Sequence, residues 1–184
     1  MRFIRKYQAL IVVALLSVAL SGCFGDDDTL AKQYADWKHK NEAYIDSVMG
    51  VKDAAGAPYF TLLTPPWAPS AYALIHWHND TTLTAGNLSP MDNSTVTMTY
   101  ELFDINGNEI SNSFASADSI YRCKPNQNIV GVWYPLTQMH VGDSVTIVMP
   151  SQSGYGEMTY GSIPPYSTLV YNIKLKAIEA YEVP

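Results

Sequence analysis

The sequence predicts an α+β fold in which an antiparallel sheet carries one short helix, and a longer helix precedes this domain. Apolar and polar residues alternate in the segments 95–103 and 168–178, a pattern that predicts strands with one buried face. Asn106 and Gly107 follow the first of these strands and are typical of a tight turn between antiparallel strands. The segment 29–49 contains neither Gly nor Pro and predicts the N-terminal helix.

Residues 1–22 have the features of a signal peptide. Arg2, Arg5 and Lys6 precede an apolar stretch over residues 9–20, which is shorter than the roughly 20 residues that a helix needs to cross a bilayer. We therefore expect this segment to be removed. The remaining length suits one domain of ordinary size preceded by a leader.

The cleavage region, Leu20 to Cys23, resembles the lipobox of bacterial lipoproteins. The resemblance implies that Cys23 becomes the first residue and carries lipid, which would place the protein in the cell envelope, anchored to the outer membrane on its periplasmic or cell-surface face. An ordinary secretory signal with a cysteine near its cleavage point is the alternative. With Cys23 lipidated, only Cys123 remains, so we expect no intramolecular disulfide and a buried, unreactive thiol.

Charge excludes one class of partner. The chain has 11 Lys and Arg against 17 Asp and Glu, and three of the 11 basic residues lie in the segment expected to be cleaved. Nucleic acid is not the expected partner of so acidic a surface.

The segment 23–52 is predicted to hold an acidic spacer, with Asp26 to Asp28, followed by the N-terminal helix. An apolar stripe runs along that helix and Gly50 can end it, whereas Asn41 interrupts the stripe. We expect the helix to pack on the edge of the domain or to serve as a stalk. The proline-rich segment 53–69 is predicted to be a connector with room for one short strand.

The main domain is expected over residues 70–184. Besides the two alternating segments, residues 72–78 and 144–149 are predicted strands. A short helix is predicted over residues 133–140, with Val132, Leu136 and Met139 on one face and Pro135 in its first turn.

The C-terminal half resembles the FKBP-type peptidyl-prolyl cis-trans isomerases. The resemblance is strongest where Gly154, Tyr155 and Gly156 are followed by the segments 163–165 and 168–171, and it spans roughly residues 95–178. It implies a curved antiparallel sheet of about five strands around one short helix. It also implies an enzyme that accelerates rotation about X–Pro bonds and needs no cofactor or metal.

The resemblance also implies a proline pocket. Five positions match the family's site residues: Tyr100 as an aromatic wall, Ile129 as a backbone N–H donor to the substrate carbonyl, Tyr155 as a hydroxyl donor, Ile163 as a loop wall and Tyr171 as the floor.

Other positions of the pocket depart from the family. Val132 stands where the family usually has a tryptophan, with Trp133 one residue later, Ile110 replaces a phenylalanine and Ser111 replaces an aspartate. We therefore expect a shallower pocket and a reduced isomerase activity. The expected partners are proline-containing segments of exported polypeptides, whose folding the protein would assist as a chaperone.

Three other functions fit the sequence less well. The domain could be a catalytically inactive FKBP-like module that binds peptides or proteins of the cell envelope. Trp67, Trp77 and Trp133 could serve as sugar platforms of a glycan-binding lipoprotein if their rings are exposed. His76 and His78 lie two residues apart and could share a face of a strand, but a third metal ligand is not apparent.

Overall fold

The computed structural model describes residues 26–181, so the predicted signal peptide and Cys23 lie outside the described residues. The chain divides into two units after Asp36, and the second unit contains the whole sheet. The helices are α2 (Asp26–Met49) and α3 (Val130–Gln138), with short 3-10 helices η1 (Thr81–Leu83), η2 (Pro125–Gln127) and η3 (Ser151–Ser153). The strands are β1 (Thr61–Leu63), β2 (Ala73–Trp77), β3 (Thr95–Phe103), β4 (Glu109–Asn112), β5 (Tyr121–Cys123), β6 (Ser144–Met149) and β7 (Leu169–Ala180).

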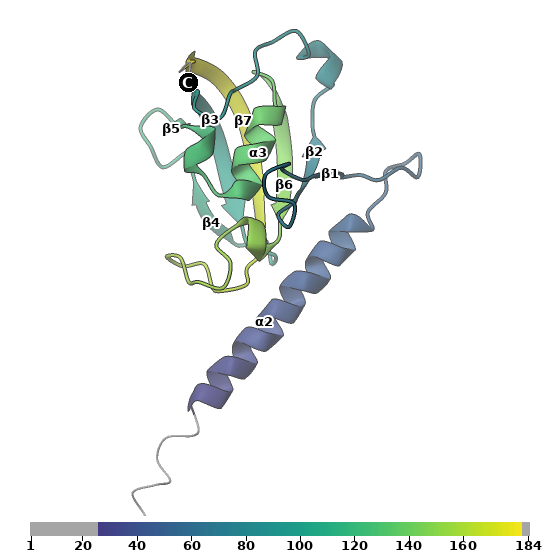
Figure 1. The fold of residues 1–184 in the computed structure, drawn as a ribbon, viewed down its shortest axis with the longest axis vertical. Helices are drawn as coiled ribbons and strands as arrows, with labels where there is room; N and C mark the ends of the chain where they lie inside the picture. The colour runs from purple at the N-terminus through teal and green to yellow at the C-terminus, as the bar shows by residue number, and fades with distance from the viewer. Residues whose placement is uncertain (1–25, 182–184) are drawn as a thin grey trace, which may run out of the picture. The chain divides into compact units, whose positions relative to one another are not determined.

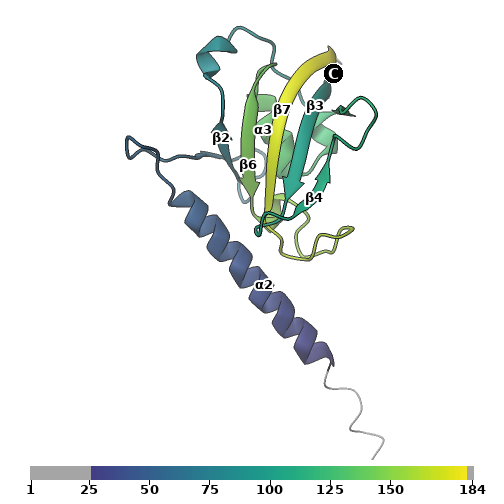
Figure 2. The same cartoon turned by 180° about the vertical axis from the view of Figure 1, so that it is seen from behind.

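The strands form one antiparallel sheet in the order β1-β2-β6-β7-β3-β4, with β5 also paired to β3. Strand β7 lies at the centre, between β6 and β3 (Figure 2). Helix α3 lies across one face of this curved sheet, which we call the inner face (Figure 1). The α+β prediction is therefore confirmed.

The four strands predicted from residue patterns are all present, two of them with the expected bounds (Thr95–Phe103 and Ser144–Met149). Alternation succeeds in β7 because Leu169, Tyr171, Ile173 and Leu175 are all buried on the inner face. The sheet nevertheless has seven strands, against the expected five or so. Three of the seven, β1, β4 and β5, are only three or four residues long.

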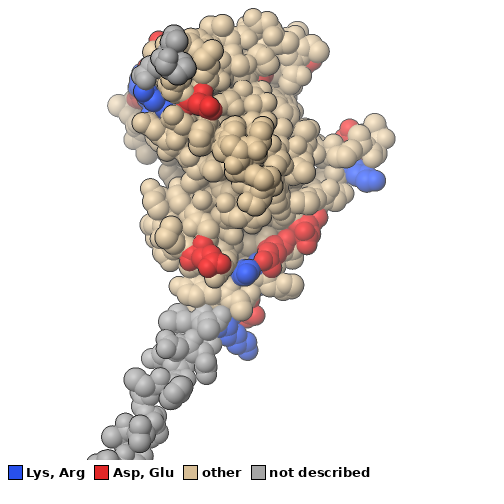
Figure 3. All heavy atoms as spheres, viewed as in Figure 1, with Lys and Arg blue, Asp and Glu red and all other residues tan. Residues whose placement is uncertain are grey.

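Charged side chains are scarce on the surface over α3 (Figure 3). The helix itself, with the sequence VGVWYPLTQ, contains no charged residue. Lys, Arg, Asp and Glu lie mainly at the margins of this view.

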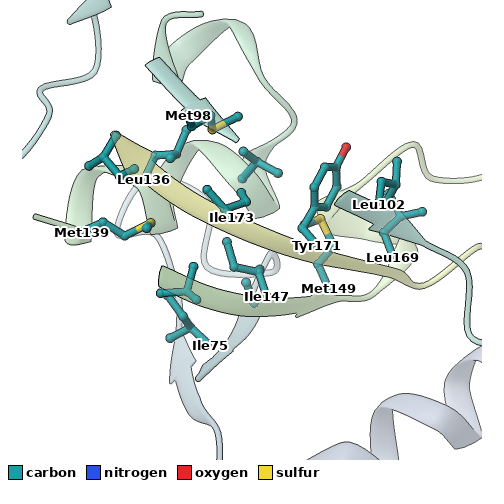
Figure 4. Packing of buried hydrophobic residues seen from close by; sticks show 14 of the residues in the cluster. Ile75, Met98, Leu102, Leu136, Met139, Ile147, Met149, Leu169, Tyr171 and Ile173 are labelled. Atoms are coloured by element: carbon teal, nitrogen blue, oxygen red, sulfur yellow. The ribbon is translucent and has the colours of Figure 1, made fainter. Parts of the chain in front are cut away.

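The core fills the space between α3 and the inner face of the sheet (Figure 4). Val132, Leu136 and Met139, the three residues predicted to face one way, are all buried in it. At Gly131 the helix backbone comes so close to β6 that an added Cβ would collide with Sδ of Met149 and lie 3.0 Å from its Cβ. Glycine is thus the residue that allows this close approach.

Helix α3 begins three residues earlier than predicted, at Val130, and ends at Gln138. Pro135 therefore lies in the helix interior and not in its first turn, which corrects the prediction. Proline has no N–H, so its position lacks the ordinary bond to the carbonyl of Gly131. The start was misplaced because Ile129 and Val130 offer no side-chain cap to mark it.

The C-terminal half of α2 packs on the opposite, outer face of the sheet. Ile45 and Val48 form a second apolar cluster with Leu74 of β2 and Val148 of β6. Asn41, only 1% exposed, joins this contact: its Oδ1 accepts a hydrogen bond of 2.6 Å from the N–H of Thr168. The residue that interrupts the apolar stripe is thus a buried polar anchor.

The predicted connector contributes a strand to the sheet, because β1 pairs with β2. Together with the packing of residues 41–48, this pairing places the start of the compact unit earlier than the residue-70 boundary that we expected. Within residues 26–181, none of the helices combines the length and the apolar character needed to cross a membrane.

A buried carboxylate joins the end of α3 to β6. Asp143 accepts hydrogen bonds from the N–H of His140 at 2.8 Å, from Thr84 Oγ1 at 2.6 Å and from Asn79 Nδ2 at 2.9 Å. Burial alone raises the pKa of the Asp143 carboxyl, but these bonds outweigh it and hold the pKa below the ordinary 3.8.

We expect Gly131→Ala to lower the free energy of unfolding by about 1–3 kcal/mol, because Met149 is fully buried and cannot move away freely. Urea denaturation measures this change. Gly86→Ala is the matched control, since no atom lies within 4 Å of a Cβ at that position. In a Met149→Ala background the cost of Gly131→Ala should shrink; an equal cost in both backgrounds would contradict the proposed contact.

We expect Asp143→Asn to lower the free energy of unfolding at pH 7 by about 1–3 kcal/mol, because an amide presents an N–H₂ group to one of three donors. The folded-state pKa is lowered, so this stabilisation is present above the unfolded-state pKa near 3.8 and disappears as the pH falls through the folded-state value. Denaturation between pH 7 and pH 2 should therefore show the difference from wild type narrowing below about pH 4. The exposed Glu157→Gln should show no comparable loss at pH 7.

Candidate active site

A cavity of about 430 Å³ lies beside the N-terminal end of α3, over the inner face of β3 and β7. Its lining side chains are apolar or uncharged polar, and five of them are tyrosines: Tyr100, Tyr121, Tyr155, Tyr160 and Tyr171. We call this cavity the tyrosine pocket.

The structure brings together most of the residues predicted from the sequence. All five positions matched to the family's site line the tyrosine pocket, and so do Ile110, Ser111 and Val132. The five are Tyr100, Ile129, Tyr155, Ile163 and Tyr171. Their roles in catalysis remain predictions, but their convergence on one cavity is a finding.

The two neighbouring central strands provide the floor. Tyr171 projects from β7 and is buried (Figure 4). Its ring centroid lies 6.0 Å from that of Tyr100 on β3. Tyr100 also shares a 3.0 Å hydrogen bond with Ser111 Oγ of β4. The residue in the place of the family's aspartate therefore still contacts this tyrosine, as a neutral hydroxyl.

Ile129 precedes the first turn of α3. Its carbonyl accepts hydrogen bonds from the N–H groups of Val132 and Trp133, each at 2.9 Å. Its own N–H donates to no atom of residues 26–181. At a helix start such an N–H is free to bind an external acceptor, for example a substrate carbonyl.

Tyr155 and Tyr160 come from the loop between β6 and β7. Their rings are stacked, with centroids 4.1 Å apart and planes inclined by 7°. Gly156, with φ of +66°, allows the turn that follows Tyr155, and Tyr160 and Ile163 form a small antiparallel bridge around Gly161. The loop thus places Tyr155 and Tyr160 in the lining of the tyrosine pocket.

Burial, followed by the neighbouring tyrosines, raises the pKa of the Tyr171 hydroxyl and of the Tyr155 hydroxyl. These two hydroxyls are therefore neutral hydrogen-bond donors at pH 7.

Among residues 26–181, no Asp, Glu, Lys, Arg or His lines the tyrosine pocket. The polar side chains in its lining are hydroxyls and amides. Cys123 lies nearby in β5, but it is buried and burial raises the pKa of its thiol. What the pocket can do is bind an apolar ring and donate hydrogen bonds to a carbonyl.

The prediction that Trp133 belongs to the pocket is wrong. Its indole Nε1 donates a 2.6 Å hydrogen bond to Asp92 Oδ1, and its ring packs against Trp67, outside the tyrosine pocket. One residue along an α-helix corresponds to a rotation of about 100°, so Trp133 cannot face the same way as Val132. Trp133 therefore does not take the place of the family's tryptophan, and Val132 and Tyr171 line this part of the pocket.

Tyr121 and Tyr160 also line the tyrosine pocket, although the sequence did not predict either as a site residue. The Tyr121 ring lies 5.3 Å from that of Tyr100, nearly perpendicular to it. Tyr121 stands on a three-residue strand, too short to show alternation, and Tyr160 lies in the loop.

The two histidines suspected of binding metal make other contacts. His78 Nε2 is 2.8 Å from Thr146 Oγ1, and the His76 ring stacks on Tyr59. Among residues 26–181, no group of three or more His, Cys, Asp or Glu could hold a metal ion.

Comparisons with known proteins agree with this geometry. Residues 86–176 match the sequence profile of the FKBP-type peptidyl-prolyl cis-trans isomerases. FK506-binding protein 1 of Gibberella zeae is 31% identical over 96 residues, which is 49% of this chain and 86% of that protein. The FKBP-type peptidyl-prolyl cis-trans isomerase FkpA of Escherichia coli is 30% identical over 89 residues, 47% of this chain but only 32% of FkpA.

Solved structures show the same fold. The crystal structure of FkpA from Escherichia coli superposes with a TM-score of 0.64, at 20% identity, over 94% of this chain and 81% of that one. A peptidyl-prolyl cis-trans isomerase from Pseudomonas syringae pv. tomato gives a TM-score of 0.55, at 19% identity, over 85% of this chain and 98% of that one. With its fold, its pocket and its sequence in agreement, the chain belongs to the FKBP-type peptidyl-prolyl cis-trans isomerase family.

Proposed function

We propose that this protein is a lipid-anchored peptidyl-prolyl isomerase that binds proline-containing segments of exported polypeptides and assists their folding. The observation that carries the proposal is the neutral tyrosine pocket with a free N–H at Ile129. A pyrrolidine ring fits against Tyr171 and Val132, while the carbonyl before the proline accepts a hydrogen bond from Ile129 or Tyr155.

Such a pocket suits bond rotation because the reaction needs no proton transfer. The barrier of about 18–20 kcal/mol comes from amide resonance, which a polar, water-exposed setting favours. Unassisted X–Pro exchange takes tens to hundreds of seconds. A dry cavity that fits the twisted amide better than the planar one lowers this barrier.

We expect the activity to be lower than is usual in the family. Val132 presents a smaller surface to a proline ring than the family's tryptophan, and Trp133 lies elsewhere. Ser111 supplies a hydroxyl in place of a carboxylate beside Tyr100. These changes weaken binding and orientation without removing a chemically necessary group.

The proposed anchor rests on the sequence before residue 26. The basic residues, the apolar stretch and the lipobox-like segment ending at Cys23 support cleavage, lipidation and attachment to the outer membrane. An exported, membrane-attached isomerase would meet its clients as they emerge from the inner membrane or on the cell surface.

A second candidate function is a module that binds proline-containing peptides without accelerating their isomerisation. Val132 and Ser111 favour it, because both reduce contacts to the reacting ring or its neighbours. The rate of cis–trans exchange of a bound peptide distinguishes the isomerase from the non-catalytic module.

We expect the mature protein to accelerate cis–trans exchange of peptides with a proline, and Tyr155→Phe to lower kcat/KM by about three- to tenfold through the loss of one hydroxyl donor. NMR exchange spectroscopy on a series of X–Pro peptides measures both quantities. Tyr181→Phe, which removes a hydroxyl that bonds Ser89 outside the pocket, is the matched control and should keep full activity.

Binding of the same peptides without faster exchange would favour the non-catalytic module. Neither binding nor exchange for any residue before proline would refute the proposed activity altogether.

We expect Cys23→Ala to abolish lipidation when the full chain is produced, with its leader, in a bacterium that processes lipoproteins. Labelling with radioactive palmitate and fractionation of membranes report the result. Cys123→Ala, which alters the other cysteine, should keep both the label and the membrane location. Label retained by Cys23→Ala would contradict the anchor.

A further inference from the structure

A second group of aromatic side chains lies outside the tyrosine pocket. Trp67 packs its ring against Trp133, with centroids 5.0 Å apart, and meets Tyr134 edge-on at 5.4 Å. We call these three residues the aromatic cluster. Two of them are neighbours on α3, and Trp67 reaches them from the segment before β2.

Trp67 is unusually exposed for its size, with 50% of its surface open to solvent. Its place is nevertheless fixed, because the Trp133 ring that it packs against is held by the 2.6 Å hydrogen bond to Asp92. Asp92 is held in turn through its carbonyl, which accepts the N–H of Asn126 at 2.9 Å. A large aromatic face held in place in water is typical of a binding surface.

A cavity of about 620 Å³ opens beside the aromatic cluster, large enough for a small ligand. Trp67, Tyr134 and Met91 give it apolar walls, and Asp92, Asn93 and Asn126 give it polar ones. Within residues 26–181, Asp92 Oδ2 and the side-chain amides of Asn93 and Asn126 make no hydrogen bond. A carboxylate oxygen and two amide groups beside the Trp67 ring are thus available to form hydrogen bonds with a ligand.

The charge around this cavity favours a neutral ligand. Of the residues that the structure describes, Asp92 is the one charged residue in the cavity's lining, and the surface over α3 carries few charged side chains (Figure 3). A basic or phosphorylated ligand would find no matching cluster of charges among the lining side chains.

We propose that the aromatic cluster and its cavity bind a neutral carbohydrate. The C–H groups on one face of a pyranose ring carry partial positive charge and stack on the negative face of an indole such as that of Trp67. Adjacent hydroxyls of the same ring pair with a carboxylate or amide, which Asp92, Asn93 and Asn126 provide. An unfolded apolar peptide would use the rings but leave these polar groups without partners.

This site is separate from the tyrosine pocket and does not depend on the proposed isomerase activity. Val132 lines the tyrosine pocket, whereas the next two residues of α3 belong to the aromatic cluster. One short helix therefore serves both sites. A glycan bound here would be held close to the place where a polypeptide is bound.

Titration of the mature protein with maltotetraose, cellotetraose and chitotetraose tests the proposal, with calorimetry for affinity and NMR for the four indole N–H signals. We expect saturable binding of at least one sugar, with shifts for Trp67 and Trp133 but not for Trp37. Trp67→Ala should weaken binding by about tenfold or more, which corresponds to about 1.4 kcal/mol. Leu83→Ala, which truncates another exposed apolar side chain, should leave the affinity unchanged.

Asp92→Asn provides a variant that keeps an acceptor for Trp133 Nε1 and therefore the cluster itself. It should weaken sugar binding while the circular dichroism and the isomerase rate stay those of wild type. The proposal is overturned if none of the three sugars binds saturably, or if binding is unchanged in Trp67→Ala. It is equally overturned if only reduced, carboxymethylated α-lactalbumin, an unfolded polypeptide, shifts the cluster signals.

Discussion

Helix α3 lies against the inner face of the sheet at a distance set by Gly131, where a side chain would collide with Met149. This close approach places Val132, Leu136 and Met139 in the core and brings the first turn of the helix over β7. The tyrosine pocket is the space that remains between that first turn, the Tyr171 ring and the loop that carries Tyr155. A helix held further from the sheet would still cover the core, but it would not bring Ile129 and Val132 into one cavity with Tyr171.

The chemistry of the tyrosine pocket follows from the absence of charged side chains among the described residues that line it. With neutral tyrosines and aliphatic side chains around it, the cavity can act only by excluding water, by shape and by hydrogen bonds to a carbonyl. Bond rotation is one of the few reactions for which these are sufficient. Because no charged side chain takes part, we expect a substitution such as Val132 for tryptophan to alter the strength of binding more than the kind of reaction.

Residue patterns predicted the parts of the fold whose burial repeats along the chain. Strands β3 and β7 are nine and twelve residues long, which leaves room for a stretch in which the period of two is visible, such as Leu169 to Lys176 in β7. The three- and four-residue strands β1, β4 and β5 show no such period, and they pair because neighbouring strands are already in place. The start of α3 was misjudged because apolar residues precede it without a polar cap.

The site was predictable to a similar extent, for a different reason. The resemblance to a family supplied Tyr100, Ile129, Tyr155, Ile163 and Tyr171, which the structure gathers although they are far apart in sequence. It placed Val132 at the position of the family's tryptophan and counted Trp133 with the pocket. One residue along a helix turns the side chain by about 100°, and Trp133 lies outside the tyrosine pocket. The resemblance assigned no role to Tyr121 and Tyr160. Their place in the pocket follows only from the three-dimensional structure.

The hydrogen bonds between α2 and the start of β7 bear on where the isomerase unit can be cut. Asn41 holds the N–H of Thr168, and Trp37 Nε1 donates to Ser167 Oγ, whose hydroxyl donates to the carbonyl of Pro164 beside Ile163. The loop that bears the pocket tyrosines is therefore fastened at its far end by residues well upstream of the family-matched segment. A fragment retaining only residues 86–176 would lose this fastening, because it lacks both Trp37 and Asn41.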